Sequence, residues 1–204
     1  LWVATYGGGL NIAVDDGHGG VRFVNSRSGL SPFRRGGFDK VRKLAITPQG
    51  VVIVSTTGGL VTFSAKAQSP GKIKYYYSTH VRGDTTSLSA PDVLNAYACK
   101  RSGKVYVTTM GGGFQQADGG ALLRDGVRFS SVKGLEPDEG MVLSMAEDRT
   151  GNLWLVREGS LNVLDARSGA IEVYGPNDWD DDIEFTEAEP VTSAGGGEIV
   201  VGVA

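Results

Sequence analysis

The sequence offers only two histidines, His18 and His80, as candidates for acid–base chemistry near neutral pH. His18 lies in a glycine-rich turn at residues 15–20, where we expect a solvated side chain, and we expect His80 in a long loop. Neither residue stands in a motif for nucleophilic, zinc-dependent or phosphate-binding chemistry. We therefore predict no catalytic residues and interpret this chain as one that is not itself an enzyme.

One acidic run, Asp178-Trp179-Asp180-Asp181-Asp182, carries the hard oxygen ligands that calcium prefers. Its spacing matches no calcium-binding loop, so we interpret it as a solvated acidic loop and predict no metal and no cofactor. Trp179 has the flat apolar surface to stack on a sugar ring. Packing against the edge of its own sheet is the alternative role for this indole.

The composition is that of a folded globular domain. The 204 residues are 40% hydrophobic and 21% charged, and the net charge of -3 does not favour nucleic acid as a partner. The single cysteine, Cys99, excludes an intrachain disulfide and a multi-cysteine metal site. The 31 glycines have no collagen-like period, and they favour a fold with many turns.

A degenerate repeat organises the chain. A short apolar stretch followed by a glycine turn recurs at residues 1–10, 51–60, 105–114, 153–161 and 199–204. The positions that we align are 50, 54, 48 and 46 residues apart, and they are Trp2, Val52, Tyr106, Trp154 and Val200. Repeats of this length, without long segments of 3.6-residue period, are typical of four-stranded β-propeller blades.

We predict an all-β fold, a β-propeller built from four-stranded antiparallel blades of about 46 to 54 residues. Each recurring segment is the second strand of a blade, and its apolar character suits a strand that is covered on both faces. The outer, fourth strands are predicted at residues 21–24, 73–77, 127–129 and 171–174. Trp2 and Trp154 lie on second strands and are predicted core residues.

The repeat divides one partial domain, residues 1–204, into blades. They span approximately residues 1–39, 40–91, 92–139 and 140–187, with the start of a further blade at 188–204. The expected strand count is three, four, four, four and two, about seventeen in all, which fits neither a closed four-bladed nor a closed five-bladed ring. Both ends look like the middle of a strand. We therefore expect an incomplete ring, about four blades of a propeller of about six to eight.

Three segments carry a resemblance to a known family. Residues 142–154, Val-Leu-Ser-Met-Ala-Glu-Asp-Arg-Thr-Gly-Asn-Leu-Trp, resemble the Val-x-x-Ile-x-Glu-Asp-x-x-Gly-x-Leu-Trp signature of two-component regulator propeller repeats. Residues 1–11 are similar to the Leu-Trp-Ile-Gly-Thr-x-Gly-Gly-Leu segment of the same repeats, and residues 29–31 to their Gly-Leu-Ser approach. The other units depart from the pattern, at residues 47–49, at Cys99 and at residues 156–157.

This resemblance implies a function. Members of the family form the periplasmic or extracytoplasmic sensor half of membrane-spanning regulators, often hybrid histidine kinases of gut Bacteroidetes that respond to oligosaccharides. The resemblance therefore implies an oligosaccharide ligand and a parent protein with a kinase domain. It also implies that the partners of this chain are the remaining blades and signalling domains of that parent, with a homodimer formed through the parent.

The loops after the second strands and the loops between blades lie on one face of a propeller, around its central channel. This places Tyr6, Thr56, Met110 and Arg157 near the axis. By loop position and side-chain chemistry, the candidate ligand-binding residues are Tyr6, Arg34, Arg35, Arg157 and Trp179. The alternative is that the pocket is built by blades outside this chain.

Three functions are compatible with these features. The first is a non-catalytic sensor propeller that binds a ligand, with a carbohydrate as the expected class, and biases a membrane-linked signalling partner. The second is a scaffold that binds a protein through its propeller face and binds no glycan. The third is a carbohydrate-active propeller enzyme, which needs a convergent acid and base that the sequence does not reveal.

Overall fold

The computed structural model describes residues 1–30, 33–66, 69–136, 140–165, 167–179, 183–186, 188–192 and 197–203. Within these residues the strands form antiparallel sheets of three, four, four, four and two strands in chain order. This confirms the predicted all-β class and the predicted strand count. Each sheet follows the chain order of its strands, as in a propeller blade.

We call the sheets the first to fifth blades. The strands of the first are β1 (Trp2–Thr5), β2 (Gly9–Asp15) and β3 (Val21–Asn25). Those of the second are β4 (Val41–Ile46), β5 (Val51–Thr56), β6 (Gly59–Ser64) and β7 (Tyr76–Ser78). Those of the third are β8 (Val93–Ala98), β9 (Lys104–Thr109), β10 (Gly113–Asp118) and β11 (Ser130–Ser131).

The fourth and fifth blades complete the described strands. The strands of the fourth are β12 (Val142–Glu147), β13 (Leu153–Arg157), β14 (Leu161–Leu164) and β15 (Ile171–Tyr174). Those of the fifth are β16 (Val191–Thr192) and β17 (Ile199–Val200). Short 3-10 helices lie in the connections, namely η1 (Gly36–Asp39), η2 (Pro70–Lys72), η3 (Gly119–Ala121) and η5 (Pro176–Asp178).

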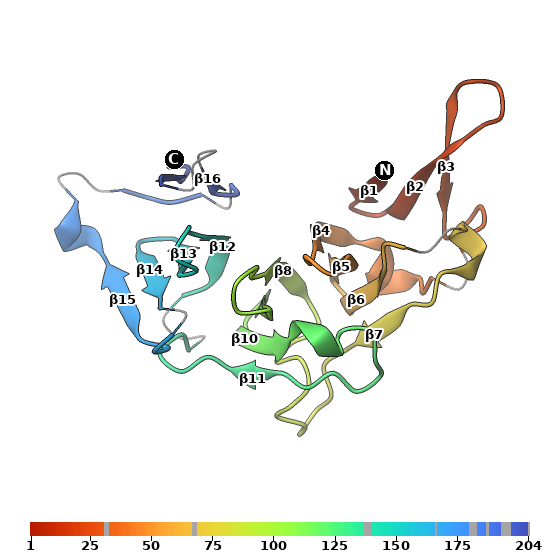
Figure 1. Cartoon of the computed structure of the whole chain (residues 1–204). Coiled ribbons are helices and arrows are strands. Elements are labelled where there is room, and N and C mark those ends of the chain that lie inside the picture. The colour runs from red at the N-terminus through yellow and green to blue at the C-terminus, as the bar shows by residue number, and fades with distance from the viewer. Residues whose placement is uncertain are drawn as a thin grey trace.

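The blades stand side by side in an arc. Figure 1 shows β4, β8 and β12 toward the middle of the arc and β3, β7, β11 and β15 along its rim. The first strand of each of the second to fourth blades is therefore the innermost strand. This order places the residues of β4, β8 and β12 around the centre.

The packing between blades explains why the second strands are so apolar. All six residues of β5 are buried. Val52 and Val54 belong to a core cluster shared with the first blade, and Val51 and Ile53 belong to one shared with the third. A strand sandwiched in this way must be apolar on both faces. The outer strand β15, by contrast, is largely exposed.

The strand register corrects one pair of positions in the repeat alignment. The turn of the second blade joins Thr56 to Gly59, whereas the turn of the third joins Thr109 to Gly113 and contains one residue more. Counting back from these turns, Ile53 is the equivalent of Tyr106, and the alignment of Val52 with Tyr106 was wrong by one residue. Both turns end at a glycine with positive φ, Gly59 or Gly113, which is a backbone conformation that glycine adopts without strain.

Two outer strands are also displaced from their predicted positions. In the second blade, Ile73 is buried in a coil segment, and the strand begins only at Tyr76. In the third blade, the backbone N–H of Phe129 donates to the carbonyl of Thr86 at 2.8 Å, so pairing with β10 is delayed to Ser130. Ile73 and Phe129, apolar residues from which we predicted strands, instead pack into the core and hold the preceding loops there.

The two predicted core tryptophans are only partly buried. Trp2 packs on Phe63 of the second blade, with ring centroids 4.6 Å apart. Trp154 stacks on Tyr174 at 6.2 Å and faces the fifth blade, of which β16 and β17 are described. Among the described residues, none of the helices is long and apolar enough to span a membrane.

Candidate functional site

The innermost strands share a local irregularity at the centre of the arc. The register of each shifts by one residue, between Val41 and Lys43 in β4, between Val93 and Asn95 in β8, and between Val142 and Ser144 in β12. The extra residues at these β-bulges are Arg42, Leu94 and Leu143. A bulge turns a side chain out of the regular alternation, and all three of these side chains line one central cavity.

This central cavity has a volume of about 630 Å³. It is lined by the innermost strands of three blades, by Tyr6 and Met110 from the turns of the first and third blades, and by residues 188–189 ahead of the fifth. The N–H of Gly7 donates to the carbonyl of Asp39 at 2.9 Å, and that of Met110 to Asp92 at 2.8 Å. These bonds place the turns and the interblade connections on one face, as predicted.

Cations from the second blade gather on one side of the cavity. Arg42 forms a two-pronged ion pair with Asp92, with N–O distances of 2.7 and 2.8 Å. The ring of Tyr6 lies 5.6 Å from the guanidinium of Arg42 and 5.9 Å from the ammonium of Lys40. The tyrosine nevertheless keeps 62% of its surface exposed, so its ring is available to a ligand.

A second polar group lies on residues that directly follow the bulges. Glu189 forms an ion pair with Lys43 and accepts a hydrogen bond from Asn95 Nδ2 at 3.2 Å. The hydroxyl of Ser144 donates to the carbonyl of Ala188 at 2.9 Å. Burial lowers the pKa of Lys43 to about 8. The segment 188–189 is thus tied to three blades at once.

Asn95 lines this cavity and carries an acceptor without a partner among the described residues. Its side chain is only 2% exposed, and within the part of the chain that the structure describes its Oδ1 has no hydrogen-bond partner. Buried amide oxygens are nearly always paired, because an unpaired one loses its hydration without compensation. A hydrogen-bond donor that reaches this oxygen would remove that loss.

Of the five residues proposed from the sequence, the structure brings Tyr6 alone to the central cavity. Arg34 lies over the ring of Tyr77 at 4.2 Å, and Arg35 is 3.8 Å from Asp39. Arg157 is buried at the junction with residue Gly140, to whose carbonyl it donates at 2.7 Å. Trp179 packs edge-on against Phe185 with ring centroids 5.7 Å apart.

The remaining sequence candidates are scattered. His80 contacts the carbonyl of Leu88 through Nδ1 at 2.8 Å, and the backbone N–H of His18 donates to the Asp16 carboxylate in an exposed turn. Asp178 accepts a hydrogen bond from Gly175, and Asp180, Asp181 and Asp182 lie outside the described residues. Among the described residues there is no cluster of three side chains suited to hold a metal.

Sequence reasoning missed Arg42, Lys43, Asn95 and Glu189. Each of these first strands carries a polar residue two positions after its initial valine, as in Val41-Arg42-Lys43 and Val93-Leu94-Asn95, but this spacing alone does not place that residue at a cavity. Strict two-residue alternation would place this residue on the same face as the valine. The bulge breaks that alternation, and no sequence pattern marked it.

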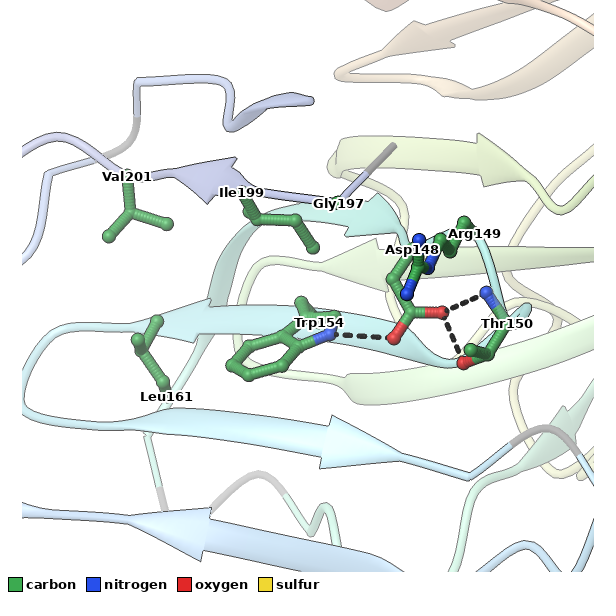
Figure 2. Close-up of a pocket in the computed structure, with 8 residues that line it drawn as sticks. All are labelled: Asp148, Arg149, Thr150, Trp154, Leu161, Gly197, Ile199 and Val201. Atoms are coloured by element: carbon green, nitrogen blue, oxygen red, sulfur yellow. Dashed lines mark hydrogen bonds between the residues drawn. The ribbon is translucent and has the colours of Figure 1, made fainter. Parts of the chain in front are cut away.

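Other hollows lie outside the centre, and two of them show how they differ from it. Figure 2 shows one of about 290 Å³ between the fourth and fifth blades, where Trp154 donates to Asp148 at 3.1 Å and faces Leu161 and Ile199. The other, about 600 Å³, runs along the third blade and includes Lys104, Gln116 and Arg128. The central cavity differs from both, because its polar groups converge from several blades.

Comparison with known proteins identifies the fold. The chain resembles the extracellular domain of BT4673 from B. thetaiotaomicron, which is described as a one-component and as a hybrid two-component system, with a TM-score of 0.66 and 14% identity. The fold is that of a β-propeller. The match covers 99% of this chain and 24% of that one, so the chain spans about a quarter of the length of this solved structure.

Two further solved structures support the propeller fold. One is the β-propeller domain of Cps50 (Swd1) from Myceliophthora thermophila, with a TM-score of 0.58, 12% identity, and coverage of 100% of this chain and 64% of that one. The other is PorZ of Porphyromonas gingivalis, a surface component of the type-IX secretion system. Its TM-score is 0.59 and its identity is 14%, and the match covers 95% of this chain and 28% of that one. No protein-family model and no curated protein matches this chain.

Proposed function

We propose that this chain is part of a non-catalytic sensor propeller of a membrane-linked two-component signalling protein, and that it binds an oligosaccharide in its central cavity. The observation that carries the proposal is the buried, unpaired Oδ1 of Asn95 in a cavity where polar groups of several blades meet. The repeat signature at residues 142–154 and the likeness to an extracellular two-component propeller support the signalling role and an extracytoplasmic location.

The cavity suits an oligosaccharide in size and chemistry. Its volume of about 630 Å³ lies within the range of small-ligand sites. Sugars present hydroxyl groups at their edges and apolar C–H groups on their faces. Asn95 and Lys43 match the hydroxyls, and Tyr6, Met110 and Leu143 offer aromatic and apolar surface to the faces.

The arrangement of carboxylates favours binding without turnover. A glycosidase usually places two carboxyl groups on either side of the bond that it cleaves. Glu189, a carboxylate that lines this cavity, is engaged by Lys43, and Asp92 beside it is engaged by Arg42. This supports a role in ligand recognition.

We further propose that the ring is completed by other blades of the parent protein. The chain spans about a quarter of the BT4673 domain that it resembles. This proposal includes the signalling domains and a homodimer through the parent. It also includes the blade divisions at residues 39/40, 91/92, 139/140 and 187/188.

The experiment is a thermal-shift screen against neutral and acidic tetrasaccharides. A ligand that binds only the folded state raises the melting temperature. We expect one or a few sugars to do so, and Tyr6→Ala to weaken the selected sugar about tenfold, by loss of a stacking surface. The matched control is Tyr76→Ala, which removes a tyrosine that also lies near a lysine, Lys74 at 4.7 Å, away from the cavity.

Three other results would count against the proposal. If Tyr6→Ala binds as tightly as the wild-type chain, the central cavity is not the site. If Tyr76→Ala loses as much affinity as Tyr6→Ala, the loss reflects general damage. If no sugar shifts a well-folded sample, the scaffold hypothesis replaces the sensor.

A further inference from the structure

Glu189 lines the central cavity. It precedes β16 in the connection that enters the fifth blade, and its carboxylate reaches Lys43 of the second blade and Asn95 of the third. These two residues hold equivalent positions, each directly after a bulge. The Glu189 carboxylate is therefore bound by residues at the same position in two neighbouring blades, Lys43 and Asn95.

Lys43 is the cation at this site that depends on Glu189. Its side chain is mostly buried, and a buried ammonium is costly without an anion close by. Arg42, the neighbouring cation, is held by both oxygens of Asp92, which comes from the connection to the third blade. The Lys43 pair can therefore exchange its anion while the Arg42 pair stays in place.

Asn95 sets a second requirement for the chemistry of the ligand. Its Nδ2 donates to the carboxylate, while its Oδ1, from the same amide, has no partner among the described residues. A ligand that satisfies both atoms carries a carboxylate with a hydroxyl group a few ångströms away. Uronic acid residues have this combination, since each sugar ring bears a carboxylate at C6 and several hydroxyls. A neutral sugar supplies only the hydroxyl.

We infer that the central cavity recognises uronic-acid oligosaccharides, and that Glu189 holds the place of the ligand carboxylate in the unliganded protein. This inference rests on the proposed oligosaccharide-binding function and names its ligand class. Binding displaces Glu189 from Lys43 and Asn95, and the ligand supplies the missing donor to Asn95 Oδ1. Because Glu189 competes with the ligand, its removal strengthens binding.

Displacement also has a structural consequence. Residues 188–189 lead through Pro190 into β16, and a further bond that holds them to an innermost strand is that from Ser144 to Ala188. Release of Glu189 therefore loosens the entry to the fifth blade from the second and third blades. Ligand binding at the centre and the placement of the next blade are linked through one side chain.

The test is isothermal titration with tetragalacturonic acid and with its fully methyl-esterified form, which has the same backbone without the charge. We expect the acid to bind at least about tenfold more tightly than the ester. Glu189→Gln is expected to strengthen acid binding about tenfold and to change ester binding less than about twofold. Lys43→Met is expected to weaken acid binding at least about tenfold.

The control is Glu172→Gln, which removes the same charge from the outer strand β15 and should bind like the wild-type chain. Equal binding of acid and ester, or unchanged acid binding by Glu189→Gln, overturns the inference. Because Glu189 is exposed, its variant remains informative if Lys43→Met does not fold. Tetraglutamate bound as tightly as the sugar acid also overturns the inference, since the recognition would then need no sugar.

The outcomes separate this inference from the proposed function. If neutral sugars bind with Tyr6-dependent affinity and the acid does not, the ligand class is wrong and the oligosaccharide site stands. If neither form binds and the screen shows no other sugar, the proposed function fails as well.

Discussion

Phe63→Ala is expected to destabilise the protein by about 3–5 kcal/mol, the largest effect of any single substitution that we predict. The ring of Phe63 is fully buried between the first and second blades. Its centroid lies 4.6 Å from that of Trp2 and 5.3 Å from that of Tyr75. Removing it leaves a cavity that these stiff neighbours cannot fill. Urea denaturation followed by circular dichroism measures the change in the free energy of unfolding.

The matched control for this prediction is Phe23→Ala. Phe23 lies on the outer strand β3 with 54% of its surface exposed, so its removal should cost less than about 1 kcal/mol. Equal losses for the two variants would show that the interface between the blades is not packed as described. The result also concerns the site, because the first blade carries Tyr6, which bridges to Lys40 of the second.

Asp148→Ala is expected to destabilise the protein by about 1–3 kcal/mol at neutral pH. Oδ1 of Asp148 accepts hydrogen bonds from the backbone and hydroxyl of Thr150 and from the backbone of Asn152. Oδ2 accepts the indole N–H of Trp154 (Figure 2). The aspartate of the repeat signature thus fixes both the turn and the tryptophan. Its loss removes the acceptor that holds the turn and the indole N–H.

The destabilisation by Asp148→Ala should depend on pH. Partial burial acts to raise the pKa of Asp148, but the hydrogen bonds from Thr150, Trp154 and Asn152 outweigh it and hold the pKa below its usual 3.8. A carboxyl with a lowered pKa in the folded state stabilises above its unfolded pKa and loses that contribution as the pH falls through the folded value. The difference between wild type and variant should therefore be largest near pH 7 and shrink below about pH 4.

Urea titrations at several pH values measure this difference. Asp125→Ala, in an exposed turn, serves as the control and should change stability little at any of them. A difference for Asp148→Ala that stays constant down to pH 2.5, a value about one unit below the usual aspartate pKa, would show that its hydrogen bonds do not favour the ionised form.

The fold could be predicted from the sequence because glycine turns and apolar second strands are local features. The turns that end at Gly9, Gly59 and Gly113 mark the blades, and the burial of β5 on both faces accounts for its unbroken apolar run. What escaped was a difference of one residue in turn length, which a repeat alignment without register cannot detect. Because of this difference, the alignment paired Tyr106 with Val52, whereas its structural equivalent is Ile53.

The candidate site was less accessible to sequence reasoning. Tyr6 and Met110 were placed near the axis because they lie in turns whose position the fold dictates. Arg157 was predicted at the same face, but the end of β13 lies against Gly140, and its guanidinium is buried there. Asn95 and Lys43 reach the cavity through bulges, and Glu189 reaches it from a position 94 residues further along the chain than Asn95. Such contacts depend on three-dimensional packing alone.

The most direct test of the central cavity as the binding site is hydrogen–deuterium exchange with and without the sugar that gives the largest thermal shift. If the cavity binds it, slower exchange is expected in residues 5–9, 40–43, 92–95 and 110–112, which surround the cavity. If that sugar is a uronic acid whose carboxylate replaces Glu189, residues 188–192 should exchange faster. Protection confined to the groove along the third blade, around Lys104 and Arg128, would contradict this assignment.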